Sequence, residues 1–296
     1  MIIHIKNHSS HAGKWIYRGF FNAWKSLGYD VKFYHSLDEI DTSTPFQIMT
    51  YDSEVKSDNL HVIEKSYRSY IFAQPNKFPM PWGSHPNFIC MCDDSTIEKL
   101  NSLPNVILWT WMDSQEYHTK WNNVNTVPLA FDNIAYRDLK KDEYVYDVCY
   151  VGGWANNGFD EKRANLINCF KSFKDSGLKC GFFINKNLTH EQENFILCNS
   201  KVSLNIHDNY QRVLGLDTNE RTFKSLGTTG ALVTDKINQI SRLFPEVLMS
   251  ENSNKLVEHV KSLIDSSELE EIKIKNIELI NLEHTYINRI NRFLKI

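Results

Sequence analysis

The amino-acid sequence predicts an α/β protein of two domains, each built around a parallel sheet. Short β-rich segments alternate with segments of helical periodicity along the whole chain, which is typical of strands joined by crossover helices. The alternation pauses once, at a charged stretch over residues 139–143, and then starts again. We therefore expect one domain over residues 1–138 and a second over 139–296, with the last helix able to cross back to the first domain.

The composition indicates a globular protein and argues against several functional classes. Hydrophobic residues make up 42% of the chain and charged residues 23%, which is enough to build a core. The formal charge of −3 gives no global basic field for a polyanion, so nucleic acid is disfavoured, although a local basic groove could still bind it. The sequence shows no secretory signal and no apolar run near the roughly 18 residues of a membrane span, so we expect a cytoplasmic protein. The six cysteines show no zinc-type spacing and are expected to be small buried residues.

The first domain opens with a strand over residues 1–6 and a helix over 14–27. Apolar residues recur with the helical period in that helix, and Gly28 is a typical C-terminal cap. A second helix is expected from Ser95 to Leu103. Prolines and a glycine crowd residues 75–86, which predicts a long loop of the kind that often lines a ligand site. Further strands are predicted over residues 31–34, 47–51, 70–73, 88–92 and 106–111.

The second domain repeats the alternation. Its strands are predicted over residues 144–151, 180–184, 202–207 and 231–234. Its helices are predicted over 160–176, from a capping box at Thr189 and Gln192, over 219–227, over 253–264 and in the charged amphipathic stretch that ends at 296. In open parallel sheets ligands bind beyond the carboxyl ends of the strands, so the candidate site residues are those that follow strands.

Two segments that follow strands could bind a phosphate group. Gly152 and Gly153 come directly after a strand and let the backbone approach a ligand closely, although such a pair is also an ordinary turn. The helix over 219–227 has an N-terminus that favours an anion, and Arg221 in its first turn can add a bidentate contact to a diphosphate. The alternative is that Glu220 and Lys224, four residues apart, form only a surface ion pair.

These segments resemble a known family. The run Arg221-Thr222-Phe223, followed by Gly227 and then by residues 230–235, resembles the C-terminal signature of the spore-maturation-protein (CgeB)-like glycosyltransferases, relatives of the group 1 glycosyltransferases. The resemblance covers roughly residues 145–290. Other parts resemble that family's first C-domain strand with its glycine turn, the strand before the signature, the closing helix and the hinge-side strand, namely residues 148–153, 202–207, 284–289 and 126–132.

The resemblance implies a GT-B fold, in which two Rossmann-like domains face each other across a cleft. The C-terminal domain would bind the nucleotide-sugar, with Arg221 near the diphosphate, Gly153 close to the donor, and Gly152 and Thr222 also among the donor-binding residues. The N-terminal domain would bind the acceptor. Basic side chains and a helix end would neutralise the leaving diphosphate, so no metal or other cofactor is expected.

Lys224 departs from the family pattern. The family usually has a carboxylate at this position, where it accepts a hydrogen bond from the nucleotide ribose. Glu220 could supply that carboxylate from the previous turn, or Lys224 could contact phosphate. The ribose contact is therefore open, and with it the identity of the nucleotide.

Candidate catalytic residues follow the strands of the first domain. His11, in the turn after the first strand, could be the general base on the acceptor hydroxyl of an inverting enzyme. Asp113 is a rival base, and Asp52 is a weaker one. Trp82, in the proline-rich loop, is the residue we select for acceptor contact, because sugars stack on aromatic rings. In the second domain, His207 ends a strand and either touches the donor or is a satisfied core histidine.

The sequence thus predicts a metal-independent glycosyltransferase that moves a sugar from a nucleotide-sugar to a glycan or another hydroxyl acceptor. A second hypothesis is a phage-type glycosyltransferase acting on a hydroxymethylated DNA base, for which Lys14, Arg18 and Lys25 on the first helix would form a basic patch. A third is a non-catalytic nucleotide-sugar-binding protein, which only the departure at Lys224 supports.

Overall fold

The chain forms two compact units. The computed structural model describes residues 1–8, 11–154 and 159–296, and of His11 it describes the backbone only. The first unit contains Met1–Pro128 and also Tyr286–Ile296, so the C-terminal segment packs with the N-terminal part of the chain, and the second unit is Leu129–Thr285.

The boundary between the units precedes the charged linker at which the sequence places it. Residues just after Pro128 already pack into the second unit, because they have partners there. The backbone N–H of Phe131 donates to the carbonyl of His284 over 2.8 Å. The hydroxyl of Tyr136 donates to the carboxylate of Glu193 over 2.6 Å.

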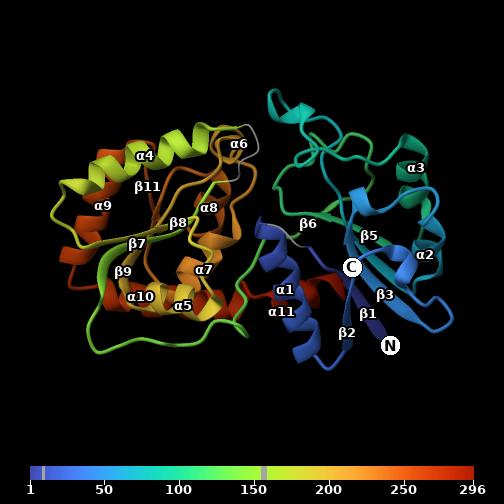
Figure 1. Cartoon of the computed structure of the whole chain (residues 1–296), viewed down its shortest axis with the longest axis horizontal. Coiled ribbons are helices and arrows are strands. Elements are labelled where there is room, and N and C mark those ends of the chain that lie inside the picture. The colour runs from blue at the N-terminus through green and yellow to red at the C-terminus, as the bar shows by residue number, and fades with distance from the viewer. Residues whose placement is uncertain (9–10, 155–158) are drawn as a thin grey trace. The chain divides into compact units, whose positions relative to one another are not determined.

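The first unit is built on a parallel sheet with the strand order β2-β1-β3-β4-β5-β6 (Figure 1). Its strands are β1 (Ile2–Lys6), β2 (Asp30–Tyr34), β3 (Phe46–Tyr51), β4 (Arg68–Phe72), β5 (Val106–Thr110) and β6 (Asn125–Thr126). Its helices are α1 (His11–Ser26), α2 (Leu60–Lys65), α3 (Asp94–Ser102) and α11 (Tyr286–Phe293), with 3-10 turns η1 (Leu37–Glu39), η2 (Asp52–Glu54) and η3 (Trp82–Ser84). Gly28 follows α1 with a φ of 86°, as expected of a helix-ending glycine.

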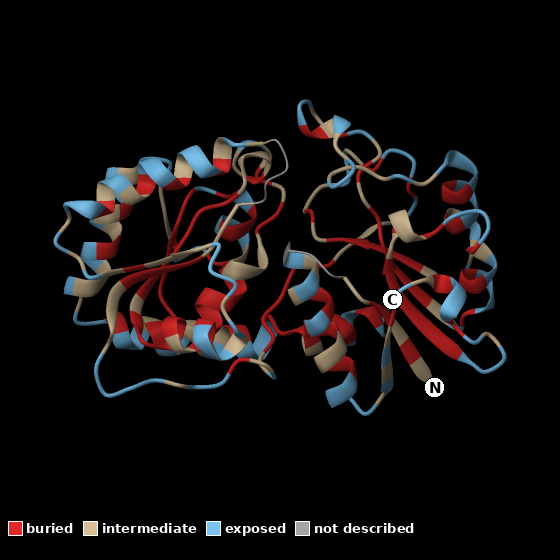
Figure 2. Ribbon diagram, viewed as in Figure 1, coloured by how far each residue is buried: buried red, intermediate tan, exposed pale blue. Residues whose placement is uncertain are grey.

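Helices cover both faces of this sheet. Successive strand residues point to opposite faces, so Trp109 of β5 packs on Phe293 of α11 while its neighbour Leu108 joins the cluster formed with α2 and α3. Figure 1 accordingly shows α1 and α11 on one face and α2 and α3 on the other. The strands are largely buried in Figure 2, and the outer helix faces are exposed.

The strand predicted over residues 88–92 is wrong, because this segment is part of a loop. It cannot pair beside β4, the strand that precedes it, since β4 already pairs with β3 and β5. Instead the segment is held by side chains: the thiol of Cys92 donates to the carbonyl of Asp52 over 2.9 Å. Gln74, at the start of the same loop, donates its backbone N–H to the Asp52 carboxylate over 2.7 Å.

The second unit is a parallel sheet with the order β11-β10-β9-β7-β8. Its strands are β7 (Tyr146–Gly152), β8 (Cys180–Ile184), β9 (Ser200–Asn205), β10 (Leu232–Thr234) and β11 (Leu248–Met249). Figure 1 shows α4 and α9 on one face of this sheet and α5, α7 and α10 on the other. The helices are α4 (Glu161–Lys174), α5 (His190–Cys198), α6 (Asn209–Leu214), α7 (Glu220–Thr228), α8 (Asn238–Leu243), α9 (Ser253–Asp265) and α10 (Leu269–Glu283). Among the residues described, no helix is long and apolar enough to cross a bilayer.

Candidate functional site

Polar side chains meet at the carboxyl ends of β7 and β9, where α7 begins. Arg221, the second residue of α7, donates from Nη1 to Oδ1 of Asn205 at the end of β9, over 2.8 Å. Its guanidinium lies 5.2 Å from the ring centre of Tyr150 in β7. Burial alone would lower the pKa of Arg221, but Tyr150 and the Glu220 carboxylate raise it above its ordinary value. A fixed positive charge therefore lies at the ligand-binding edge of this sheet.

Gly152 and Gly153 are glycines because other side chains come close to their backbone. A Cβ built on Gly152 would lie 2.6 Å from Cζ of Arg221, so no larger residue fits without moving the guanidinium. A Cβ built on Gly153 would lie 2.8 Å from Cγ of Asn185. The structure thus brings together Gly152 and Arg221, which are far apart in the sequence.

The start of α7 adds the partial charge of a helix N-terminus to that of Arg221. Asn219 is the N-cap residue, with extended backbone angles, and its Oδ1 accepts from Nδ2 of Asn205 over 2.9 Å. Thr222, in the first turn, is 0% exposed and bonds to Thr218 over 2.6 Å and to Asn205 over 3.0 Å. Thr222 therefore fixes the turn, while the helix end and Arg221 together favour an anion such as a diphosphate.

His207 is a histidine satisfied in the protein interior, the second of the two alternatives left by the sequence. Its side chain is 0% exposed. Nδ1 lies 2.6 Å from the carboxylate of Asp235, and Nε2 lies 2.7 Å from the hydroxyl of Thr218. Burial would raise the pKa of Asp235, but His207 and Arg212 hold it below its ordinary value. Through its contact with Thr218, this network holds the loop that precedes α7.

Lys224 is a buried residue whose ammonium pairs with two carboxylates. It is 7% exposed, and its ammonium lies 2.9 Å from the carboxylate of Glu193 and 3.4 Å from that of Glu220. Burial would lower the pKa of Lys224, but the two carboxylates raise it well above its ordinary value. The predicted ion pair between Glu220 and Lys224 is present, but the prediction that it lies on the surface is wrong. The pair belongs to a buried cluster that also contains Glu193 and Tyr136, whose hydroxyl donates to Glu193.

The sequence-predicted residues of the first unit are spread over its sheet edge. Asp113 is half-buried after β5. Asp52 is 0% exposed. Burial raises its pKa to about 6, although hydrogen bonds from Gln74, Cys90 and Ser53 lower the pKa in part. Trp82 is 5% exposed and packs near Phe78, which leaves little ring surface for stacking a sugar. The side chain of His11 lies outside the described residues.

Several residues of the site were missed by sequence reasoning. Asp235 directly follows a predicted strand, so the rule that selected Gly152 could have selected it as well. Asn205 lies inside the strand predicted over residues 202–207, and only the observed end of β9 places it at the sheet edge. Glu193 had no such signal, because its contact with Lys224 arises only when α5 packs beside α7.

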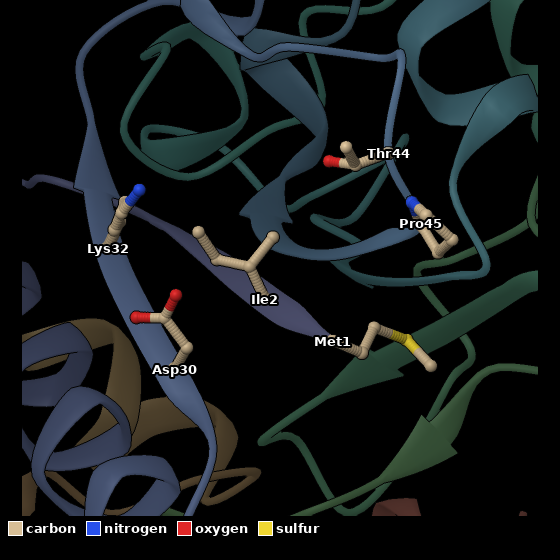
Figure 3. Close-up of a pocket in the computed structure, with 6 residues that line it drawn as sticks. All are labelled: Met1, Ile2, Asp30, Lys32, Thr44 and Pro45. Carbon is tan, nitrogen blue, oxygen red and sulfur yellow. The ribbon is translucent and has the colours of Figure 1, made fainter.

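A separate cavity of about 560 Å³ lies in the first unit (Figure 3). It is lined by Met1, Ile2, Asp30, Lys32, Thr44 and Pro45. Ile2 and Asp30 are the first residues of β1 and β2, so the cavity lies at the amino ends of the strands. Because parallel sheets bind ligands at the opposite edge, we do not assign this cavity to the reaction.

Comparison with known proteins gives a match to one family over the C-terminal half of the chain. Residues 154–295 match the model of a protein family described as glycosyl transferase-like. A search of curated protein sequences found no match.

Solved structures resemble the chain over nearly its whole length. An α-glucosyltransferase in complex with UDP-glucose and DNA containing an abasic site has a TM-score of 0.59 at 11% identity, covering 99% of this chain and 98% of that one. AviGT4, a glycosyltransferase involved in avilamycin A biosynthesis, has a TM-score of 0.53 at 10% identity and coverages of 99% and 96%. The α,α-trehalose 6-phosphate synthase from Burkholderia multivorans has a TM-score of 0.55 at 9% identity and coverages of 97% and 75%. With two parallel-sheet α/β units, these likenesses confirm the predicted GT-B fold.

Proposed function

We propose that this protein is a glycosyltransferase that moves a sugar from a nucleotide-sugar to a hydroxyl acceptor. The family match over residues 154–295 includes α7, and it supports the activity. The observation that carries the proposal is the position of Arg221 at the opening of α7, against Gly152 and Asn205.

The donor diphosphate is the group this arrangement suits. Arg221 can hydrogen-bond phosphate oxygens in a bidentate manner, and the α7 N-terminus lies beside it. When the bond between sugar and diphosphate breaks, negative charge grows on the leaving oxygens. Arg221 and the helix end would stabilise that charge without a metal ion.

The nucleotide contact is a finer proposal, and it concerns Glu220. The CgeB-like subtype would have its ribose-binding carboxylate where this chain has Lys224, and Lys224 is held between two carboxylates. Of these two, Glu220 is the first residue of α7, directly before Arg221. We therefore assign the ribose contact to Glu220, with Lys224 fixing its position.

The donor is identified by thermal shift with UDP, GDP, CDP, TDP and ADP. A nucleotide at about 100 times its dissociation constant stabilises the folded protein by roughly 2.7 kcal/mol. We expect at least one of the five to raise the melting temperature. If none does so at millimolar concentration, the proposal fails.

A DNA acceptor is the second candidate, and one observation favours it. Lys14, Arg18 and Lys25 are all exposed on α1. A basic stripe of this kind can contact a phosphate backbone, and such binding weakens steeply with salt. A gel shift that appears at low salt and disappears at high salt would support this acceptor; its absence leaves a glycan or another hydroxyl compound. The cytoplasmic location and the base roles of His11 and Asp113 remain predictions.

A further inference from the structure

Strand β2 is a free edge of the first sheet. Among the residues that the structure describes, β2 pairs with β1 on one side and with no strand on the other. The carbonyl of Tyr34 accepts from the backbone N–H of Asn7 over 2.9 Å, so Tyr34 directs its backbone groups toward β1. Because backbone groups alternate along a strand, Val31 and Phe33 direct theirs away from β1. An edge with outward N–H and C=O groups can pair with another strand.

Two opposite charges lie on one face of β2. Asp30 and Lys32 are exposed and two residues apart, so they share a face, and Figure 3 shows both beside Ile2 of β1. Within the described ranges of the chain, neither forms a salt bridge. His4 of β1 lies beside Lys32, and burial and Lys32 lower its pKa, so it adds no positive charge to this face near neutral pH. The exposed edge therefore carries one carboxylate and one ammonium.

A second copy of the chain is complementary to this edge. Consider two β2 strands that run antiparallel about a two-fold axis at Val31. Val31 then faces Val31 of the second copy, and their outward backbone groups exchange two hydrogen bonds. In the same register, Asp30 faces Lys32 of the second copy, and Lys32 faces its Asp30. These are non-hydrogen-bonded pairs, in which facing side chains come closest, so the opposite charges stabilise the contact twice.

Charge disfavours the neighbouring registers. An axis at Lys32 would place the two Lys32 ammonium groups opposite each other, and an axis at Asp30 would do the same with the two carboxylates. An axis between two residues would set outward backbone groups against inward ones. Arg18, whose guanidinium lies 4.8 Å from the ring of Phe33, is on the other face of the sheet and takes no part in this charge pattern. One register therefore satisfies both the backbone and the charges.

We propose that this protein forms a two-fold symmetric dimer through its β2 edges, which joins the two first sheets into one continuous sheet. The inference does not depend on the proposed function. Because the paired strands are antiparallel, the carboxyl edges of the two sheets point in opposite directions, and the contact covers neither ligand-binding edge. A strand of five residues buries less than the roughly 1,200 Å² of a stable interface, so the dimer forms in a concentration-dependent manner.

Sedimentation equilibrium at protein concentrations up to about 0.5 mM tests the dimer. Asp30→Lys and Lys32→Asp each place like charges opposite each other in both pairs, so each should weaken dimerisation at least about 10-fold. The double variant exchanges the two charges and should dimerise like the wild type. An equimolar mixture of the two single variants should form a heterodimer, because each lysine then faces an aspartate. Lys65→Asp, at the exposed end of α2, makes the same change in net charge as Lys32→Asp and should dimerise normally.

Three results would overturn the proposal. The first is a wild type that stays monomeric up to about 0.5 mM. The second is a dimer that both single variants form as readily as the wild type does, since the contact would then lie elsewhere. The third is a mixture of the single variants that stays monomeric. Circular dichroism checks that each variant folds, and should one single variant not fold, the other single variant and the double variant still decide the question.

Discussion

At the scale of single residues, the proposed donor site depends most on Arg221. It is the cationic side chain at the start of α7, held by Asn205 and placed against Gly152. Arg221→Ala removes a charged hydrogen bond worth roughly 1.5–3 kcal/mol, so nucleoside diphosphate affinity should fall about 10- to 150-fold. Affinity for the free nucleoside should not change. Calorimetry measures both, with Arg163→Ala, an exposed arginine on α4, as the control. If Arg221→Ala binds the nucleoside diphosphate as tightly as the wild type does, the phosphate site does not lie at this helix.

Lys224 is expected to matter for stability. Removing one partner of a buried ion pair leaves an uncompensated charge, so Lys224→Ala should destabilise the protein by about 3–5 kcal/mol. Lys224→Glu should be worse, because it would place a third carboxylate beside Glu193 and Glu220. Lys255→Ala is the matched control, since its ion pair with Glu258 is exposed and should contribute about 0–1 kcal/mol. Urea denaturation measures all three variants, and equal losses for Lys224→Ala and Lys255→Ala would contradict the buried cluster.

At the scale of elements, Asp52 fastens the loop after β4 to the end of β3. Burial raises the pKa of Asp52 in the folded protein to about 6, above the ordinary aspartate value of about 3.9, so the neutral acid is favoured in the folded protein. Its contribution to stability is therefore present in full below about pH 4 and is lost as the pH rises through 6, in total about 3 kcal/mol. Asp52→Asn cannot ionise, so its stability profile should lack this loss. Urea denaturation from pH 4 to 7 compares the two, and Asp58→Asn should follow the wild type.

The elements that the sequence predicts well are those in which local pattern and tertiary setting agree. The sequence predicts β7 and α7 at nearly their observed positions, since their periodicity and the glycines beside them indicate a strand, a turn and a helix. Residues 88–92 form a short apolar run like a buried strand but lie in a loop, because such a run does not by itself determine whether a segment joins the sheet.

In the candidate site, too, the sequence predicts what topology determines and misses what depends on packing. Gly152 and Arg221 could be placed together from topology alone, because strand ends in a parallel sheet share one edge. The pairing of Lys224 with Glu193 could not, since it depends on how α5 and α7 pack.

At the scale of the whole molecule, the first unit needs both ends of the chain. Phe293 in α11 is 0% exposed and contacts Tyr70, Trp109 and Phe20 at ring distances of 5.2, 5.4 and 6.0 Å. In the same helix, Arg289 donates to the carbonyl of Pro128 over 2.7 Å. The last residues of the chain therefore complete the core of the unit that the first residues begin.

Phe293→Ala should accordingly destabilise the first unit by about 3–5 kcal/mol, the usual cost of truncating a buried phenylalanine. The neighbouring Leu294 is 41% exposed, so Leu294→Ala should change stability by no more than about 0.5 kcal/mol. Chemical denaturation followed by tryptophan fluorescence reports on this unit, because Trp24 and Trp109 are both buried in it. Nucleoside diphosphate affinity, measured without denaturant, should be the same in both variants, since Arg221 and α7 belong to the second unit. Equal stability of the two variants would show that α11 is dispensable, and a loss of nucleotide affinity in Phe293→Ala would show that the donor site depends on the first unit.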